Sequence, residues 1–353
     1  MENLRIGVIG AGIIGQTHIA TIKATPGFTL SAFVEPADAP AAILEREGAK
    51  RFTSAKALMD SGLVDGVIIA TPNETHAPIA CELLAGGINV LIEKPVTNTV
   101  EEAQAIMAAE ARSRARALVG HHRRHNPIVA TAKASIDDGL IGDLVNATVL
   151  STLMKPDDYF QVAWRRKDGV GGPFRINLIH EIDMLRHLFG EVAWVSATRT
   201  FAPRSLPVED GGAAMLGFAN GGLAAITISD RAIGPWAWDI ASGENTARFP
   251  KSGAEAHFYS GTRGALSLPS LTFWSHDGTP SWTTPMTHRA LAFEPGDPYQ
   301  RQLQHFGDVI RGTAVPLISA LDGARDIATL DAILLAAEKK CEVEVVQVAA
   351  PAS

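Results

Sequence analysis

Two short segments of this chain carry side chains that could move protons at a hydroxyl group. Lys94 lies in Glu93-Lys94-Pro95, directly after an apolar stretch, and His180 opens the segment His180-Glu181-Ile182-Asp183. A lysine ammonium beside a hydroxyl lowers the pKa of that hydroxyl and stabilises the alkoxide that develops as the proton leaves. A histidine titrates near neutral pH and can take or return the proton. The alternative for Lys94 is an ordinary solvated lysine in a loop.

The histidines of the chain also raise the alternative of a metal site. On a helix, His180, Asp183 and His187 would lie close to one face. A zinc-protease pattern needs histidines four residues apart, but residue 184 is methionine. Three more histidines fall within residues 121–125, where no carboxylate stands at short range to complete a ligand set. The sequence therefore predicts no metal, and His187 is interpreted as an ordinary half-buried helix residue.

A glycine pattern near the start of the chain predicts a dinucleotide-binding turn. Gly10, Gly12 and Gly15 follow the alternating stretch Leu4–Ile9 and precede a helix-compatible stretch, residues 16–24. In this G-x-G-x-x-G motif the first glycine permits a tight turn, the second lets the backbone approach a pyrophosphate, and the third lets helix and strand pack closely. The helix N-terminus then directs free N–H groups at the phosphates. The alternative is a glycine-rich turn that merely saves space.

An acidic residue stands where such a site binds the ribose. The apolar stretch Phe28–Val34 ends at Glu35, about 20 residues beyond Gly15. A carboxylate at this position accepts hydrogen bonds from the ribose hydroxyls of NAD, whereas a 2′-phosphate would meet like charge. No Arg or Lys follows in Pro36-Ala37-Asp38. We therefore expect NAD, rather than NADP, as the cofactor.

The composition excludes several classes of protein. Of the 353 residues, 46% are hydrophobic and 20% are charged, which is typical of a folded globular protein. The net charge of −7, without a block of Lys and Arg, argues against nucleic acid as a partner. No apolar run approaches the ~18 residues of a membrane span, and a strand that begins at Leu4 leaves no room for a cleaved signal sequence. With only Cys81 and Cys341, a reducing, cytoplasmic location is expected.

The order of the expected elements predicts two domains. Short strands alternate with helices up to about residue 120, which indicates an α/β dinucleotide-binding Rossmann domain with a doubly wound parallel sheet over residues 1–123. Beyond residue 144 strands follow one another directly, and Asn220-Gly221 predicts a hairpin. Residues 124–353 are therefore expected to form an α+β domain with an open, mostly antiparallel sheet. The strands expected in the first domain are Leu4–Ile9, Phe28–Val34, 66–70, Asn89–Ile92 and Ala117–Val119.

The chain resembles the glucose–fructose oxidoreductase, inositol dehydrogenase and rhizopine catabolism family (Gfo/Idh/MocA) over nearly its whole length. Besides the glycine fingerprint, the resemblance rests on Thr71-Pro72-Asn73 with His76 and on Glu93-Lys94-Pro95. It extends to the glycine-rich lead into His180 and Asp183, to Asp297-Pro298-Tyr299 and to Pro316 before the last helix. The features most specific to the family are Lys94 within the Glu93-Lys94-Pro95 motif and His180.

The resemblance implies a role for each matching residue. His180 would exchange the proton of a substrate hydroxyl while hydride moves to or from the nicotinamide ring, and Lys94 would touch both cofactor and substrate. Asn177, Arg124, Asn126 and Trp164 are the expected substrate-binding residues. The second domain would form the substrate wall and the oligomer interface. The expected cofactor-binding residues are Gly10, Gly12, Ile13, Ile14, Gly15, Glu35, Thr71, Pro72, Asn73, His76, Glu93 and Lys94.

One position departs from the family pattern. Many members carry an aspartate four residues before the histidine, and here that residue is Ile176, with Asn177 next to it. The acid that would orient His180 and couple to its charge is therefore missing. Asn177 can hydrogen-bond substrate or cofactor, but it cannot accept a proton at neutral pH.

Substrate and partners are encoded less directly. Amide and guanidinium donors beside tryptophans suit a polyhydroxylated ring, so a sugar, a cyclic polyol or a related hydroxy compound is the expected substrate. Strand-like residues 213–219 and Leu223–Ser229 are apolar on both faces, which predicts a homo-oligomer, dimer or tetramer, formed through the C-terminal sheet. Two other functions stay open: a redox-neutral NAD-dependent glycosidase or eliminase, and a non-catalytic dinucleotide-binding sensor. Loss of both Lys94 and His180 would have favoured the sensor, and both are present.

Overall fold

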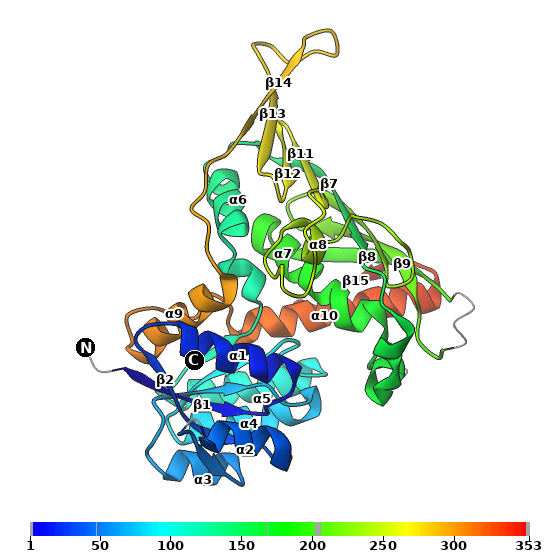
Figure 1. Cartoon of the computed structure of the whole chain (residues 1–353). Coiled ribbons are helices and arrows are strands. Elements are labelled where there is room, and N and C mark those ends of the chain that lie inside the picture. Colours follow the sequence, from blue (N-terminus) through cyan, green and yellow to red (C-terminus); the bar gives the residue numbers. More distant parts are fainter. Residues whose placement is uncertain (1–2, 47, 168, 202–205, 351–353) are drawn as a thin grey trace. The chain divides into compact units, whose positions relative to one another are not determined.

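The chain folds into two compact units (Figure 1). The computed structural model describes residues 3–46, 48–167, 169–201 and 206–350. Unit 1 comprises Met1–His125, Gly296–Ile327 and Val348–Ser353, and unit 2 comprises Asn126–Pro295 and Ala328–Gln347. The sequence predicts a single boundary after residue 123, whereas two later segments return to unit 1. They return because the helix that begins at Pro298 packs against the helix that follows the glycine motif.

Unit 1 is built on a parallel sheet of six strands in the order β3-β2-β1-β4-β5-β6. The order runs outward from β1 in both directions, so a crevice forms at the carboxyl ends of β1 and β4. β4, β5 and β6 are wholly or almost wholly buried because helices cover both faces, as Figure 1 shows. The strands are β1 (Leu4–Ile9), β2 (Phe28–Val34), β3 (Lys50–Phe52), β4 (Gly66–Ile69), β5 (Asn89–Ile92) and β6 (Ala117–Val119).

Some helices of unit 1 begin at a side-chain cap that the sequence supplies. Thr99 and Glu102 form a capping box at the start of α5, and the Ser54 side chain caps α3. The strand β3 and the helix α3 are absent from the elements expected from sequence. None of the described helices combines the length and apolarity needed to cross a membrane. The helices of this unit are α1 (Ile13–Ala24), α2 (Asp38–Arg46), α3 (Ala55–Asp60), α4 (His76–Ala85), α5 (Val100–Ala111), α9 (Pro298–Ile310), the start of α10 (Ala320–Lys339), and the 3-10 turns η1 (Asn73–Thr75) and η2 (His122–His125).

Unit 2 contains a sheet of nine strands in the order β14-β13-β12-β11-β7-β10-β9-β8-β15. Its pairs are antiparallel except for β7 with β10, so the expectation of a mostly antiparallel sheet is confirmed. Asn220-Gly221 lies in the turn that joins β9 to β10, as expected. The strands are β7 (Leu144–Thr152), β8 (Val192–Thr200), β9 (Gly211–Phe218), β10 (Leu223–Ser229), β11 (His257–Gly261), β12 (Ala265–Leu268), β13 (Thr272–His276), β14 (Met286–Ala290) and β15 (Val343–Glu344).

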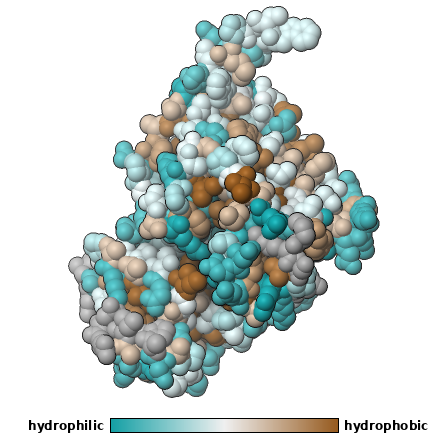
Figure 2. Space-filling view, turned by 45° about the vertical axis from the view of Figure 1, so that its right-hand side comes forward, coloured by the Kyte–Doolittle hydropathy of each residue, from teal (hydrophilic) through white to brown (hydrophobic). Residues whose placement is uncertain are grey.

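The two faces of this sheet differ in burial. In β10, Ala224, Ile226 and Ile228 are buried, whereas the residues that alternate with them, Leu223, Ala225 and Thr227, are exposed. One face therefore packs in the core of unit 2 and the other lies open. The hairpin of β13 and β14 projects from the unit, as Figures 1 and 2 show. The helices of unit 2 are α6 (Pro127–Asp137), α7 (Ile179–Phe189), α8 (Trp238–Ala241), the end of α10, and the short turns η3 (Asp157–Gln161), η4 (Ala163–Arg166) and η5 (Phe174–Leu178).

Candidate functional site

The turn between β1 and α1 has no room for a side chain at two of its glycines. Gly10 has a φ of +91°, and a Cβ there would lie 2.6 Å from the carbonyl oxygen of Ala70. A Cβ on Gly15 would clash with the carbonyl oxygen of Gly10. Gly12, in contrast, has nothing within 4 Å of a Cβ position and caps α1 without a side-chain hydrogen bond. The turn thus combines tight backbone packing with one open glycine at a helix N-terminus, which is what a pyrophosphate needs.

Glu35 closes the other side of this turn. Its Oε2 accepts a hydrogen bond of 2.7 Å from the Ala11 amide, and its Oε1 accepts one of 2.8 Å from the Ala37 amide. Each carboxylate oxygen retains a further acceptor position for a ribose hydroxyl. The exposed Ile13 side chain, 64% accessible, stands at the start of α1 beside the half-buried Ile14. The exposed Ile13 side chain provides apolar surface that a dinucleotide bound at this turn would cover.

Arg51 is a cationic neighbour that the sequence did not indicate. It lies on β3, and its guanidinium donates to the carbonyl oxygens of Glu35 and Pro36 and to the Asp38 carboxylate, at 3.0 to 3.2 Å. The pairing of β2 with β3 brings it beside Glu35. The Arg51 guanidinium donates to these acceptors and not to the Glu35 carboxylate. The charged group next to the Ala11 amide is therefore the carboxylate of Glu35.

Lys94 is held in place by a buried hydrogen bond between its neighbour Glu93 and His18. The Oε1 of Glu93 lies 2.7 Å from Nε2 of His18, and both residues are at most 5% exposed. The Oε2 of Glu93 accepts the Lys94 amide at 3.1 Å. Burial raises the pKa of Glu93, but the hydrogen bond from His18 and the charges of His18, Lys94 and His122 outweigh it, so the pKa lies below its usual range. Since His18 lies on α1, this pair ties the Lys94 turn to the glycine-turn helix.

His76 joins two loops at the carboxyl edge of the sheet. Its Nε2 lies 3.0 Å from the Thr71 carbonyl oxygen and its Nδ1 lies 3.1 Å from that of Pro95. The ring is 1% exposed, and burial lowers its pKa against the effect of these carbonyls. Thr71 is held further by a hydrogen bond of 2.6 Å from Thr75. Pro72 precedes η1, which begins at Asn73, so the whole Thr71-Pro72-Asn73 segment is fixed beside the Lys94 turn.

The segment that follows β6 is buried. Arg124 is 6% exposed, and its Nη1 lies 3.5 Å from Oδ1 of Asp322. Asn126 caps α6 with its Oδ1 and donates from Nδ2 to Glu244 at 2.9 Å. Both side chains therefore have partners within their own unit, and their role in binding substrate stays a prediction.

In unit 2, His180 lies in the first turn of α7 and Asn177 lies just before that helix, in η5. His180 is 8% exposed, whereas Asn177 is half-buried. The Oδ1 of Asn177 accepts a hydrogen bond of 2.6 Å from Nζ of Lys155, which is itself 7% exposed. Lys155 lies just beyond the carboxyl end of β7 and was not expected from sequence. No motif surrounds it, so only the pairing of β7 with β10 reveals its environment.

The glycine turn before Asn177 is packed against a buried acid. Gly172 has a φ of +81°, and a Cβ there would clash with Glu209. Oε1 of Glu209 accepts the Phe174 amide at 3.1 Å, and Arg199 lies 3.6 Å from its Oε2. Burial and the charge of Asp230 raise the pKa of Glu209 against the effect of these donors. The predicted substrate residue Trp164 is 46% exposed on η4, where an aromatic ring is available for contact.

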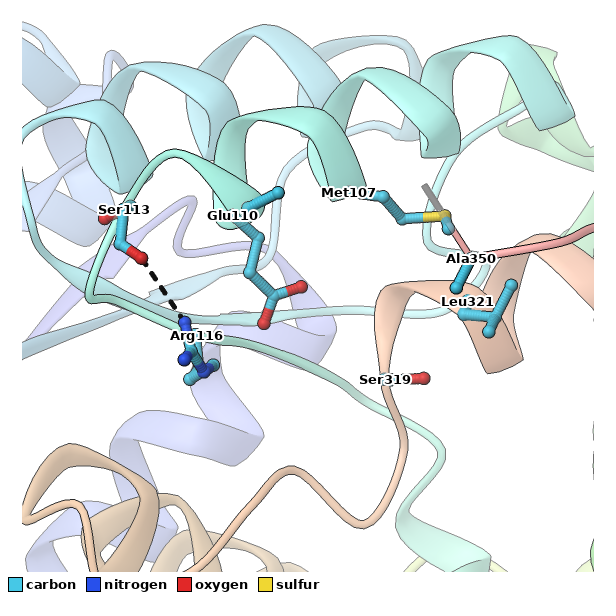
Figure 3. Close-up of a pocket in the computed structure, with 8 residues that line it drawn as sticks. Met107, Glu110, Ser113, Arg116, Ser319, Leu321 and Ala350 are labelled. Atoms are coloured by element: carbon cyan, nitrogen blue, oxygen red, sulfur yellow. Dashed lines mark hydrogen bonds between the residues drawn. The ribbon is translucent and has the colours of Figure 1, made fainter. Parts of the chain in front are cut away.

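A surface hollow of about 290 Å³ in unit 1 is separate from these residues. Figure 3 shows it between the end of α5 and the start of α10, with Glu110 and Arg116 in its wall. Arg116 directly precedes β6, so the hollow lies at the amino ends of the strands. The glycine turn, Glu35 and Lys94 follow the carboxyl ends. The hollow is therefore not the dinucleotide site.

Comparison with known protein families gives a match over most of the chain. A model described as "Oxidoreductase family, NAD-binding Rossmann fold" matches residues 4–121. Its companion, "Oxidoreductase family, C-terminal alpha/beta domain", matches residues 133–345. Both carry the designation Gfo/Idh/MocA.

Curated relatives include dehydrogenases and a catabolic protein. The chain is 32% identical to levoglucosan dehydrogenase of Pseudarthrobacter phenanthrenivorans over 236 residues, 63% of this chain and 60% of that protein. It is 31% identical to the rhizopine catabolism protein MocA of Rhizobium meliloti over 54% of this chain and 59% of that protein. It thus spans about three fifths of these two relatives. Inositol 2-dehydrogenase of Rhizobium meliloti strain 1021 is 28% identical over 97% of this chain and 99% of its own length.

Solved structures support the fold. A levoglucosan dehydrogenase in complex with NADH and levoglucosan superposes with a TM-score of 0.81 at 22% sequence identity, over 98% of this chain and all of that one. At this identity the likeness establishes the architecture alone.

The buried Glu93–His18 pair predicts how stability depends on pH. Because the pKa of Glu93 is lowered on folding, the stability that it contributes is complete above about pH 4.3 and is lost as the pH falls through the folded pKa. At pH 7, Glu93→Gln should lower the free energy of unfolding by about 1 to 3 kcal/mol. The difference from the parent should shrink in strongly acidic buffer. Urea titrations over a pH series measure it, with the exposed Glu74→Gln as control; equal parent and Glu93→Gln curves at pH 7 would contradict the assignment.

Proposed function

Because the chain belongs to the Gfo/Idh/MocA oxidoreductase family, we propose that it is an NAD-dependent dehydrogenase or reductase. It moves a hydride between nicotinamide and a secondary alcohol or carbonyl of a sugar, cyclic polyol or related hydroxy compound. The observation that carries this proposal is the contact between Glu93 and His18, which fixes the Lys94 turn to the helix that begins at the glycine motif. The named relatives, levoglucosan dehydrogenase and inositol 2-dehydrogenase, suggest the class of substrate.

In the oxidative direction, Lys94 and His180 have different roles at the substrate hydroxyl group. Bound NAD supplies the hydride acceptor. Lys94 stays protonated and donates to the substrate oxygen, so its charge offsets the negative charge that develops there. His180 takes the hydroxyl proton as general base and returns it in the reverse direction. Residue 176 is isoleucine, so His180 performs this step without a carboxylate one turn before it.

The open face of the sheet in unit 2 is the proposed interface for a second copy of the chain. Paired residues across the strands share a face, and one such row is Ser196, Met215, Ala225, Thr148 and Phe258. Met215 is 47% and Phe258 39% exposed, and no side chain in this described row is charged. Figure 2 shows hydrophobic atoms on the surface of unit 2 among neutral ones. An uncharged, partly apolar row of side chains across five strands favours a homo-oligomer, a dimer or tetramer.

The roles of Lys94 and His180 predict distinct kinetic losses. Lys94→Ala should lower kcat while NAD still binds, because the charge acts mainly in the transition state. His180→Ala should lower kcat by about 10²- to 10⁴-fold. The half-buried His187→Ala on the same helix is the matched control. Ile176→Asp should shift the rising limb of the pH profile of kcat/KM toward higher pH. An unchanged limb together with an active His180→Ala enzyme would assign the proton to another group.

The position of Glu35 predicts a preference for NAD over NADP. Isothermal calorimetry should give the lower dissociation constant for NAD, because a 2′-phosphate would approach the carboxylate that binds the Ala11 amide. Glu35→Gln should reduce the ratio of the two constants. Asp38→Asn, which removes a largely exposed neighbouring carboxylate, is the control and should leave the ratio close to that of the parent. Tighter binding of NADP by the parent would refute the preference.

The uncharged row of side chains on the open face of the sheet predicts that the protein forms an oligomer in solution. Light scattering at micromolar concentration should give the mass of a dimer or tetramer. Met215→Asp should shift the mass toward the monomer, because it places a charge in the proposed interface, where oligomer formation would bury it. Val315→Asp, at an 80% exposed residue of unit 1, is the control and should not change the mass. A monomer mass for the parent protein would contradict the proposed interface.

A further inference from the structure

Lys155 is a buried cation whose partners in unit 2 include an amide oxygen, a carboxylate and an aromatic ring. Its Nζ lies 2.6 Å from Oδ1 of Asn177, 3.5 Å from Oδ2 of Asp230 and 4.9 Å from the centre of the Tyr159 ring. Lys155 is 7% and Asp230 is 2% exposed. A buried ammonium needs such partners to remain charged, and here a carboxylate, an amide oxygen and an aromatic face provide them.

The contact with Lys155 fixes the orientation of the Asn177 amide. An ammonium group has donors and no acceptor, so the amide must present its oxygen to Lys155. The NH2 group of Asn177 is then turned away from Lys155. Asn177 is half-buried, so part of the residue is exposed, and it precedes His180 by about one turn. Donation from the charged lysine also polarises the amide and strengthens its N–H groups as donors.

The side chain of Lys155 is not required to hold its own loop. The Lys155 amide donates to the Asp230 carbonyl oxygen at 2.8 Å, and the Leu153 amide donates to that of Ser229 at 3.0 Å. The backbone alone therefore joins the segment after β7 to the segment after β10. A buried ion pair is also no more stabilising than apolar residues of similar volume. A role in the function of the site therefore explains the Lys155–Asp230 pair better than a contribution to stability does.

We propose that Lys155 is a positioning residue that locks Asn177 so that its NH2 group donates to an oxygen of the bound substrate. This inference rests on the proposed function, which supplies a substrate rich in such oxygens. The acceptor is a hydroxyl, ring or carbonyl oxygen adjacent to the carbon that exchanges hydride. The specificity of the site then includes a requirement for an acceptor at this position.

The variant Asn177→Asp removes the N–H groups that would donate to the substrate but keeps the oxygen that contacts Lys155. Aspartate keeps an oxygen for Lys155 but has no N–H for the substrate. Its kcat/KM should fall about tenfold, mainly through KM, because one hydrogen bond to substrate is lost. The melting temperature should not fall, because the contact with Lys155 remains. Asn245→Asp, which keeps the oxygen that caps its own turn, is the matched control and should retain the parent kcat/KM.

A double-mutant cycle tests whether Lys155 acts through Asn177. Lys155→Met combined with Asp230→Asn removes both buried charges and should lower kcat/KM in the parent, yet change it little when Asn177 is already alanine. The probes are myo-inositol, levoglucosan and a panel of sugars and polyols, with NADH absorbance as readout. If the parent is active and Asn177→Asp has the same kcat/KM, this inference is overturned while the proposed function stands. The same holds if the losses in kcat/KM are additive in the cycle. A parent that reduces no NAD with any of these compounds overturns the proposed function and this inference with it.

Discussion

Close backbone contact at the turn between β1 and α1 is the constraint on which the site in unit 1 depends. A side chain at Gly10 or Gly15 would displace either the Ala70 carbonyl or the start of α1. Because the turn is this tight, the α1 N-terminus lies directly at the carboxyl end of β1, and the Ala11 amide reaches Glu35. The same helix carries His18, so its position also determines where Glu93 and Lys94 lie.

Buried charge performs a comparable task in each unit. In unit 1, His18 holds the carboxylate whose other oxygen binds the Lys94 amide. In unit 2, Lys155 is paired with Asp230 and holds the Asn177 amide just before His180. Compared with apolar residues of similar volume, buried charged contacts of this kind add little net stability, although removing one partner is costly, and they give a side chain one orientation. Preorganised donors of fixed direction are what stabilise charge that develops during proton transfer.

Local patterns predicted the fold far better than the contacts of the site. The glycine motif, the strand Phe28–Val34 and the Asn220-Gly221 turn are determined by neighbouring residues, and the structure contains them as expected. The strand Lys50–Phe52 was missed because three residues carry no periodic signal. His18 and Lys155 were missed for another reason: their partners Glu93 and Asp230 lie about 75 residues away, and strand and helix packing alone brings them together.

The central claim is that this chain transfers hydride from a hydroxyl-bearing carbon to NAD. Isotope transfer tests it most directly. The hydroxy compound that gives the highest rate is prepared with deuterium on its hydroxyl-bearing carbons and incubated with protein and NAD. We expect mass spectrometry to find one deuterium on the nicotinamide ring of each NADH formed, in an amount equal to the carbonyl product. Consumption of the substrate with no labelled NADH accumulating would contradict it and indicate redox-neutral chemistry.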